Sequence, residues 1–264
     1  MPPHPSPRSN DPIQRGLTSP SPIETTTFFL GRLASPVLQY GILKRSWGAP
    51  LLHRLHGTTL PSGPPWITAT PLDRLGLSPY RTILWAMSVG SVAKQNYHLL
   101  ATMQEKLKPG FGAQVAVFNA VADTINSMLF VCAQTSASVN GEGFPQTPLI
   151  VGGALYVTGI LVELVSEQQR HNWKRRDGNR GRVYGGGLFG LARHINYFGY
   201  TLWRMGYALA AGGWTWAGVL AALSCWQFTQ VTIPAHREYL EGKYGEQYRA
   251  YEEATPYRFI PYVY

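Results

Sequence analysis

Long apolar stretches most constrain what this chain can fold into. A helix needs about 20 apolar residues to cross the hydrocarbon core of a bilayer. The stretches that reach this length are 80–103, 111–136, 147–166 and 195–233. Lys94 makes the first stretch marginal, and Gly212 and Gly213 divide the last into two spans. The sequence therefore predicts an all-α, multi-span transmembrane helical bundle, with a soluble all-helical bundle as the alternative.

The segments around the spans differ in composition. Residues 1–24 hold seven prolines and no apolar core for a signal peptide, which predicts a disordered tail. Residues 25–57 are apolar but interrupted by charges, so we expect a helix on the membrane surface or partly inserted. Residues 58–80 predict a loop, and residues 235–254 a polar C-terminal helix. We expect residues 25–264 to form a single helical membrane domain.

The chain carries a formal net charge of +9, although only 14% of its residues are charged. The basic residues gather in one short stretch between apolar segments. They are Arg170, His171, Lys174, Arg175, Arg176, Arg180, Arg182 and Arg193. Under the positive-inside rule, this pattern places the 170–182 loop and the C-terminus in the cytosol. Because no recognition module is present, we do not expect nucleic-acid binding.

Neither the cysteines nor the paired histidines indicate a special site. Cys132 and Cys225 lie far apart in apolar runs, which predicts buried free thiols rather than a disulfide. His53 and His56 have H-x-x-H spacing, but no further ligands lie nearby, so we predict a solvated helix face and no metal.

Gly185, Gly187 and Gly190 match the dinucleotide pattern G-x-G-x-x-G. A Rossmann domain requires a strand before the pattern and an acidic residue about 20 residues after it. Here a basic polar loop precedes the glycines, and no acidic residue occurs between Asp177 and Glu238. We therefore exclude a Rossmann domain. The glycines instead allow the backbone to approach a ligand or a neighbouring helix closely.

Polar residues recur with helical spacing at the end of the third apolar stretch. Glu163, Glu167, Arg170 and Lys174 are separated by four, three and four residues, which places them on one helical face. Either this face is a salt-bridged helix end, or it is a wall that faces a bound nucleotide, with the two basic residues on its phosphates.

A second polar group opens the fourth span. Arg193 and His194 can pair with phosphate, and the amide of Asn196 can both donate and accept, as an amide-bearing ring such as nicotinamide requires. With Tyr197, these residues could equally form an interfacial belt.

A third group follows the fifth span and consists of His236, Arg237 and Tyr239. If the fourth and fifth spans form a hairpin, the three basic groups converge at one face of the membrane.

With these motifs in order, residues 150–264 resemble the steroid 5-alpha-reductase C-terminal family, which includes a branch known as domain of unknown function 1295. The segments that carry the resemblance are Arg182, GGLF at 186–189, RHINYFG at 193–199, GYALA at 206–210 and HREYL at 236–240. The ending PYRFIPYVY is similar to the tail of the sterol C14-reductases.

The resemblance implies an all-helical membrane reductase that binds NADPH in a cytosol-facing pocket. It implies that Arg182, Asn196 and Tyr239 contact NADPH. Glu167 stands in place of a family Asp, and Lys174 in place of a family Arg, both near the nucleotide. The cofactor-binding residues that we predict are Glu167, Lys174, Arg182, Arg193, Asn196, Tyr197, His236 and Tyr239.

The chain also departs from the family pattern. Tyr200 occupies the position of a family Glu near the nicotinamide, and Ala235 that of a family His. Tyr97 is a candidate for the proton-donating tyrosine of the steroid enzymes, with an interfacial tyrosine as the alternative. No catalytic residue is assigned.

Three functions follow from this resemblance. The first is NADPH-dependent reduction of an activated C=C bond in an apolar substrate, such as a steroid, sterol or enoyl lipid, in the endoplasmic reticulum membrane. The second is a membrane methyltransferase that uses S-adenosylmethionine. Isoprenylcysteine and phospholipid methyltransferases share the RHP-x-Y-x-G motif, and an aromatic residue at Tyr200 favours them. The third is a non-catalytic membrane protein on a degenerate reductase fold.

Overall fold

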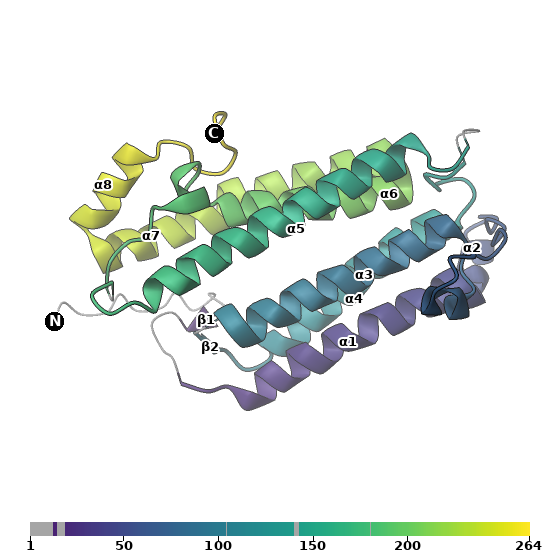
Figure 1. The fold of residues 1–264 in the computed structure, drawn as a ribbon, viewed down its shortest axis with the longest axis horizontal. Coiled ribbons are helices and arrows are strands. Elements are labelled where there is room, and N and C mark those ends of the chain that lie inside the picture. The colour runs from purple at the N-terminus through teal and green to yellow at the C-terminus, as the bar shows by residue number, and fades with distance from the viewer. Residues whose placement is uncertain (1–12, 15–18, 104, 140–142, 180) are drawn as a thin grey trace. The chain divides into compact units, whose positions relative to one another are not determined.

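The computed structural model describes residues 13–14, 19–103, 105–139, 143–179 and 181–264. The described part is almost entirely helical, with one antiparallel pair of two-residue strands (Figure 1). The predicted all-α fold is therefore confirmed, and the described strands are too short for the sheet of a Rossmann domain. Most of the predicted tail and Arg180 lie outside the described residues.

The described residues form two compact units. We call residues 12–156 and 205–218 the N-terminal unit, and residues 157–204 and 219–264 the C-terminal unit. Two long helices, α5 (Thr147–Lys174) and α6 (Ile195–Trp226), contribute to both units.

The N-terminal unit is built mainly from three helices. Its remaining elements are short. In chain order they are β1 (Ile13–Gln14), α1 (Pro22–Arg45), α2 (Ala49–Arg54), η1 (Pro71–Leu75), α3 (Pro79–Tyr97), η2 (His98–Thr102), β2 (Lys106–Leu107) and α4 (Phe111–Val131). Figure 1 shows α1, α3 and α4 side by side, and α1 packs against both of the others. As expected, residues 58–80 are mostly loop.

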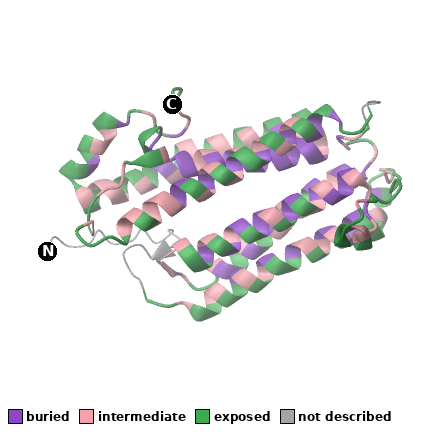
Figure 2. Cartoon of the chain, viewed as in Figure 1, coloured by how far each residue is buried: buried purple, intermediate pink, exposed green. Residues whose placement is uncertain are grey.

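Helix α1, expected on the membrane surface or partly inserted, packs against other helices of the N-terminal unit. Phe28, Arg32, Ser35 and Gln39 are buried and fall on one face, at spacings of four, three and four residues (Figure 2). That face packs on α4 and α3, because its polar side chains find hydrogen-bond partners there.

The C-terminal unit contains the second half of the chain's elements. After α5 these are η3 (Gly187–Gly190), α6, η4 (Gln227–Thr232), α7 (Ile233–Tyr244) and α8 (Glu246–Ala254). Gly213 interrupts α6 with a left-handed φ of 75°, which confirms the predicted division of this apolar stretch. The predicted C-terminal helix is two helices, since the chain turns at Gly245, where φ is 52°.

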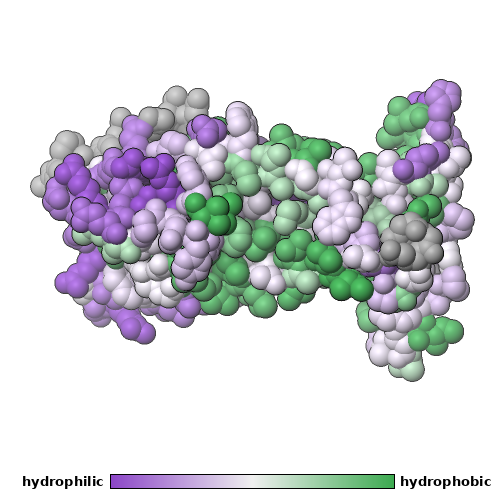
Figure 3. All heavy atoms as spheres, turned by 90° about the horizontal axis from the view of Figure 1, so that it is seen from above, coloured by the Kyte–Doolittle hydropathy of each residue, from purple (hydrophilic) through white to green (hydrophobic). Residues whose placement is uncertain are grey.

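Among the described residues, three helical segments are long and apolar enough to cross a membrane: Phe111–Val131, Thr147–Lys174 and Ile195–Tyr244. Helix α3, at the first predicted span, is not among them. Hydrophobic side chains such as Val117, Phe118 and Ile150 are exposed on the long helices, and Figure 3 shows apolar atoms gathered on one face. The chain is therefore an integral membrane protein by the hydropathy of its helices.

Small residues allow α5 and α6 to approach closely. Within the N-terminal unit, a Cβ atom on Gly152 would lie 2.6 Å from the carbonyl oxygen of Gly206. Within the C-terminal unit, a Cβ atom on Gly199 would lie 2.9 Å from the carbonyl oxygen of Gly159. Both distances are shorter than van der Waals contact, so any side chain at these glycines would push the helices apart.

We predict that Gly152→Ala lowers the free energy of unfolding by about 1–3 kcal/mol, because the added methyl group overpacks the helix contact. The neighbouring Gly153→Ala is the matched control. Its Cβ atom would meet only Met87 Cε, at 4.0 Å. Thermal unfolding in detergent micelles measures both, and equal melting temperatures would contradict the close contact.

Candidate functional site

The loop that leads into α6 is held by the C-terminal tail. The backbone N–H groups of Arg193 and His194 donate to the carbonyl oxygens of Tyr257 and Arg258, both at 2.9 Å. The Tyr251 hydroxyl donates to the carbonyl oxygen of Phe189 at 2.8 Å. The sequence around 185–199 is therefore fixed by a segment more than 50 residues later in the chain.

Glu252 links two arginines. Its carboxylate lies 3.3 Å from Arg193 Nη2 and 3.0 Å from Arg237 Nη2. Arg193 Nη1 also donates to the carbonyl oxygen of Thr255 at 3.0 Å. The Nε atom of Arg193 is buried and has no hydrogen-bond partner among the described residues. Arg193 is thus held in place by its guanidinium nitrogens while one donor stays unused.

Aromatic rings form a stack beside Arg193. The rings of His194 and Tyr197 are nearly parallel, with centroids 5.3 Å apart, and the ring of Phe228 stacks on Tyr197 at 4.7 Å. His236 lies at the edge of the stack, where its Nδ1 is 3.4 Å from the Tyr197 hydroxyl. Tyr200 packs edge-on against Phe228 at 5.7 Å. We call these five residues the aromatic cluster.

The aromatic cluster joins residues from both sides of the Gly213 break. His194, Tyr197 and Tyr200 belong to the start of α6, whereas Phe228 and His236 follow its end. This arrangement requires the two apolar segments to fold back as a hairpin, and it brings the second and third predicted polar groups together.

His194 is uncharged at neutral pH. Burial lowers its pKa to about 3, and the positive charges of Arg193 and Arg170 act in the same direction. The ring therefore serves as a neutral aromatic surface rather than as the phosphate-binding cation that the sequence suggested.

The polar residues predicted to lie on one face of α5, Glu163, Glu167, Arg170 and Lys174, contact different neighbours. Glu163 and Glu167 are buried, and Glu163 accepts a hydrogen bond of 2.7 Å from the indole of Trp203. The Arg170 guanidinium lies 5.1 Å from the centre of the Phe189 ring. Glu163 and Arg170 thus pack against aromatic side chains of neighbouring elements.

Lys174 and Arg182 lie together. Lys174 Nζ donates to the carbonyl oxygen of Arg182 at 2.9 Å and to the hydroxyl of Tyr244 at 2.8 Å. The Arg182 side chain is exposed. Tyr244 ends α7, the helix that also carries His236 and Tyr239, so α7 runs between this basic pair and the aromatic cluster.

Asn196 and Tyr239 lie beside residues of the aromatic cluster. Asn196 is buried on the first turn of α6, and the Tyr239 ring is 6.5 Å from that of His236. Tyr97 is 43% exposed at the end of α3, as an interfacial tyrosine would be.

Sequence patterns did not identify Phe228 or Glu252 as site residues. Phe228 lies in an apolar run, and Glu252 in a polar helix, where neither stands out from its neighbours. The tyrosine at position 200, first noted as a departure from the family, is part of the aromatic cluster. Its hydroxyl accepts a hydrogen bond of 3.1 Å from Arg204 Nε.

The described residues contain no group of three His, Cys, Asp or Glu side chains that could hold a metal. His53 and His56 are exposed, as predicted. Cys132 is a buried free thiol as predicted, while Cys225 is a half-buried one.

The family described as "Protein of unknown function (DUF1295)" matches residues 91–255, which include the aromatic cluster and most of the C-terminal unit. The chain belongs to this family. It is distantly related to steroid 5-alpha-reductases, sterol reductases and isoprenylcysteine methyltransferases. The predicted relationship is therefore confirmed.

Individual relatives match over different lengths. The probable O-methyltransferase ustE of Ustilaginoidea virens is 35% identical over 88% of this chain and 83% of its own length. The human 3-oxo-5-alpha-steroid 4-dehydrogenase 1 is 27% identical over 42% of each chain. Protein-S-isoprenylcysteine O-methyltransferase B of Arabidopsis thaliana is 26% identical over 46% of this chain and 60% of its own length. The chain is thus related to both reductases and methyltransferases.

We predict that stability falls in acid because of His194. The unfolded chain binds a proton on this residue below its ordinary pKa of 6.5, whereas the folded chain binds it only near pH 3. The part of the free energy of unfolding that depends on neutral His194 is therefore fully present above pH 6.5. It falls by about 1.4 kcal/mol per pH unit as the pH decreases toward 3.

Melting temperatures of the wild type and His194→Gln between pH 7.5 and pH 5 test this prediction. The variant should show the shallower decline. His53→Gln, which changes an exposed histidine, should keep the wild-type slope. Identical slopes for the wild type and His194→Gln would show that His194 is not held neutral.

Proposed function

We propose that the protein is a membrane O-methyltransferase that uses S-adenosylmethionine and acts on an apolar substrate. The observation that carries this proposal is the extent of the similarity to the probable O-methyltransferase, which covers 88% of the chain. The similarity to the human steroid enzyme covers 42%. The methyltransferase likeness thus includes most of both units, and it favours the second of the three functions expected from sequence.

The aromatic cluster fits the cationic part of S-adenosylmethionine. A sulfonium ion is attracted to the faces of aromatic rings, as other organic cations are. Phe228 provides such a ring, with the Tyr197 ring 4.7 Å and the Tyr200 ring 5.7 Å from it. A charged histidine beside them would repel the cation, whereas His194 is kept neutral by burial.

The amino-acid end of the cofactor also has a suitable partner. The buried Nε of Arg193 lacks a hydrogen-bond acceptor among the described residues, and leaving a buried charged donor unpaired costs free energy. A carboxylate would satisfy it. Glu252 and the tail already hold the other guanidinium nitrogens, so this donor is fixed in direction before a ligand binds.

S-adenosylmethionine supplies an electrophilic methyl group when bound. The chain's own contribution is to orient the acceptor oxygen and to take its proton where the acceptor is a hydroxyl. We assign His236 as the base that takes this proton. Its half-buried imidazole has a ring nitrogen, Nδ1, that lies 3.4 Å from the Tyr197 hydroxyl. The Tyr197 contact positions the ring. We place the activity in the endoplasmic reticulum membrane, with the 170–182 loop and the C-terminus toward the cytosol.

Reduction with NADPH is the second candidate. It is favoured by two neighbouring basic residues, the exposed Arg182 and the half-buried Lys174, whose charges suit phosphate groups. In that case Glu167, Asn196 and Tyr239 would complete the nucleotide site that the resemblance implies.

Ligand titration distinguishes the two cofactors. We predict that S-adenosylmethionine and S-adenosylhomocysteine raise the melting temperature of the detergent-purified protein, because ligand at about 100 times its Kd adds about 2.7 kcal/mol of stability. NADPH at equal concentration should have no effect. A shift with NADPH alone would favour the reductase, and no shift with any of these ligands would favour a non-catalytic protein.

Substitution of His236 tests the proposed base. We predict that His236→Phe reduces methyl transfer from radiolabelled S-adenosylmethionine to a membrane lipid extract by about 10²–10⁴-fold, because a positioned base contributes that much. Cofactor affinity should change little. Tyr197→Phe keeps the stacked ring and should reduce transfer less. His56→Gln, at an exposed histidine, is the control. Full activity in His236→Phe would show that another group accepts the proton.

A further inference from the structure

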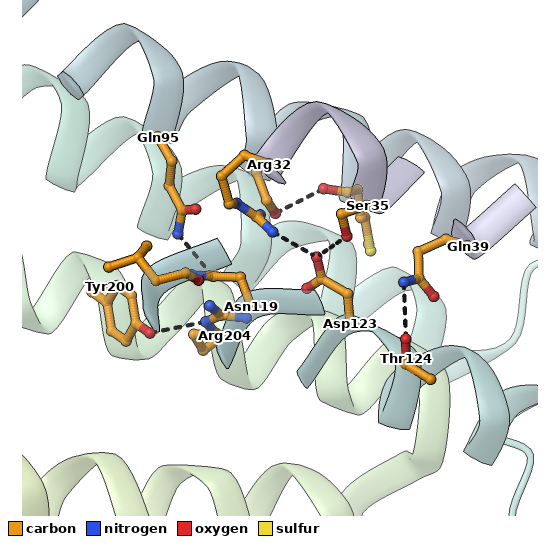
Figure 4. A network of polar contacts seen from close by, with 12 residues as sticks. Arg32, Ser35, Gln39, Gln95, Asn119, Asp123, Thr124, Tyr200 and Arg204 are labelled. Carbon is orange, nitrogen blue, oxygen red and sulfur yellow. Dashed lines mark hydrogen bonds and ion pairs between the residues drawn. The ribbon is translucent and has the colours of Figure 1, made fainter. Parts of the chain in front are cut away.

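The N-terminal unit has a polar interior that the proposed function does not use. Arg32 of α1 and Asp123 of α4 are both fully buried, and Arg32 Nη1 lies 3.4 Å from Asp123 Oδ2 (Figure 4). Ser35 donates to the same carboxylate oxygen at 2.9 Å. Because α4 is apolar enough to span a membrane, an ion pair at its centre is costly and indicates a function for this region.

Side-chain contacts show how the three helices align. Arg32 reaches Asp123, and Gln39 reaches Thr124 at 3.3 Å, so α1 and α4 run in the same direction. Gln95 of α3 donates to Asn119 of α4 at 3.1 Å. Helix α3 runs the opposite way, since its earlier residues contact later residues of α1. These contacts are Arg81 to Leu43, Trp85 to Pro36 and Asn96 to Phe29.

This alignment places two buried serines at one level. Ser88 lies about two helical turns before Gln95, and Ser127 about two turns after Asn119. Because α3 and α4 are antiparallel, both serines fall at the same height, one turn beyond Thr124, the residue that Gln39 contacts. Ser88 Oγ, Ser127 Oγ and Gln39 Oε1 are all buried without a hydrogen-bond partner among the described residues.

The two amides nearest Asn119 also present unused oxygens. Asn119 Nδ2 donates to the carbonyl oxygen of Val115, which fixes Asn119 Oδ1 as an acceptor and the amide nitrogen of Gln95 as its donor. The Asn96 amide donates to the carbonyl oxygen of Phe29. Gln95 Oε1 and Asn96 Oδ1 therefore remain as buried acceptors with no donor among the described residues.

We propose that the interior between α1, α3 and α4 is a binding site for O–H hydrogen-bond donors. Its polar groups lie at two levels about two helical turns apart: Gln39 Oε1 with the Ser88 and Ser127 hydroxyls at one level, and Gln95 Oε1 with Asn96 Oδ1 at the other. Buried polar atoms in native proteins are almost always satisfied, and acceptors of this kind take water or an alcohol. The donors come either from internal water or from the hydroxyl group of an apolar alcohol in the membrane. This proposal stands whether or not the protein is a methyltransferase.

Cysteine labelling tests the site with a matched pair on one helix. Ser88 and Ser91 are both fully buried in α3, but Ser91 Oγ donates to the carbonyl oxygen of Met87 at 2.8 Å and lies 3.1 Å from the Tyr156 hydroxyl. In a protein with Cys132→Ala and Cys225→Ala, Ser88→Cys should react with 2-aminoethyl methanethiosulfonate about 10-fold faster than Ser91→Cys. Ser127→Cys should react like Ser88→Cys.

Protection separates the two sources of the donor. Slower labelling of Ser88→Cys with 1-dodecanol, but not with dodecane, would show that a membrane alcohol enters the site. Fast labelling that neither compound slows would assign the donors to water. Equally slow labelling of positions 88, 91 and 127 would mean a dry interior and would overturn the proposal.

The thermal stability of alanine variants provides a second measurement that requires no labelling. If a donor satisfies Ser88, then Ser88→Ala should lower the melting temperature by about 2 °C, the same decrease that we expect for Ser91→Ala. If the Ser88 hydroxyl is buried in a dry interior, removing it should raise the melting temperature, which would contradict the site.

Discussion

Polar groups inside apolar helices must find hydrogen-bond or ionic partners, because the hydrocarbon of the bilayer supplies none. This requirement explains the main contacts of both units. In the N-terminal unit, Arg32 pairs with Asp123. In the C-terminal unit, Glu163 accepts the indole N–H of Trp203, and Glu252 pairs with Arg193. These contacts link helices that are far apart in sequence, so the polar residues determine which helices pack together.

The candidate site follows from the same requirement combined with one break in the helix. Gly213 reverses the direction of α6, and the chain after it returns Phe228 and His236 to Tyr197. The tail then pairs with the backbone of Arg193 and His194. These contacts bury His194, and burial keeps its imidazole neutral. The aromatic cluster is therefore aromatic rather than cationic in character.

Position 200 illustrates how the same framework can serve different chemistry. Where the reductase resemblance expects a carboxylate, the chain has a tyrosine whose ring packs on Phe228. A carboxylate near the nicotinamide suits a reductase, whereas an additional aromatic ring suits a sulfonium cofactor. This exchange agrees with the extensive similarity to a probable O-methyltransferase and supports our proposal of S-adenosylmethionine over NADPH.

Periodicity and composition alone determined the helical class, the division of the last apolar stretch at Gly213 and the polar groups at 193–197 and 236–239. These are local properties, since apolar length and glycine conformation depend on nearby residues. Family membership came from short motifs in the correct order. Only the tertiary structure decided that α1 packs on α3 and α4, that Glu163 faces a tryptophan and that Phe228 and Glu252 contact the candidate residues Tyr197 and Arg193. Those outcomes depend on which side chains meet across more than 20 residues of sequence, and no local pattern encodes that pairing.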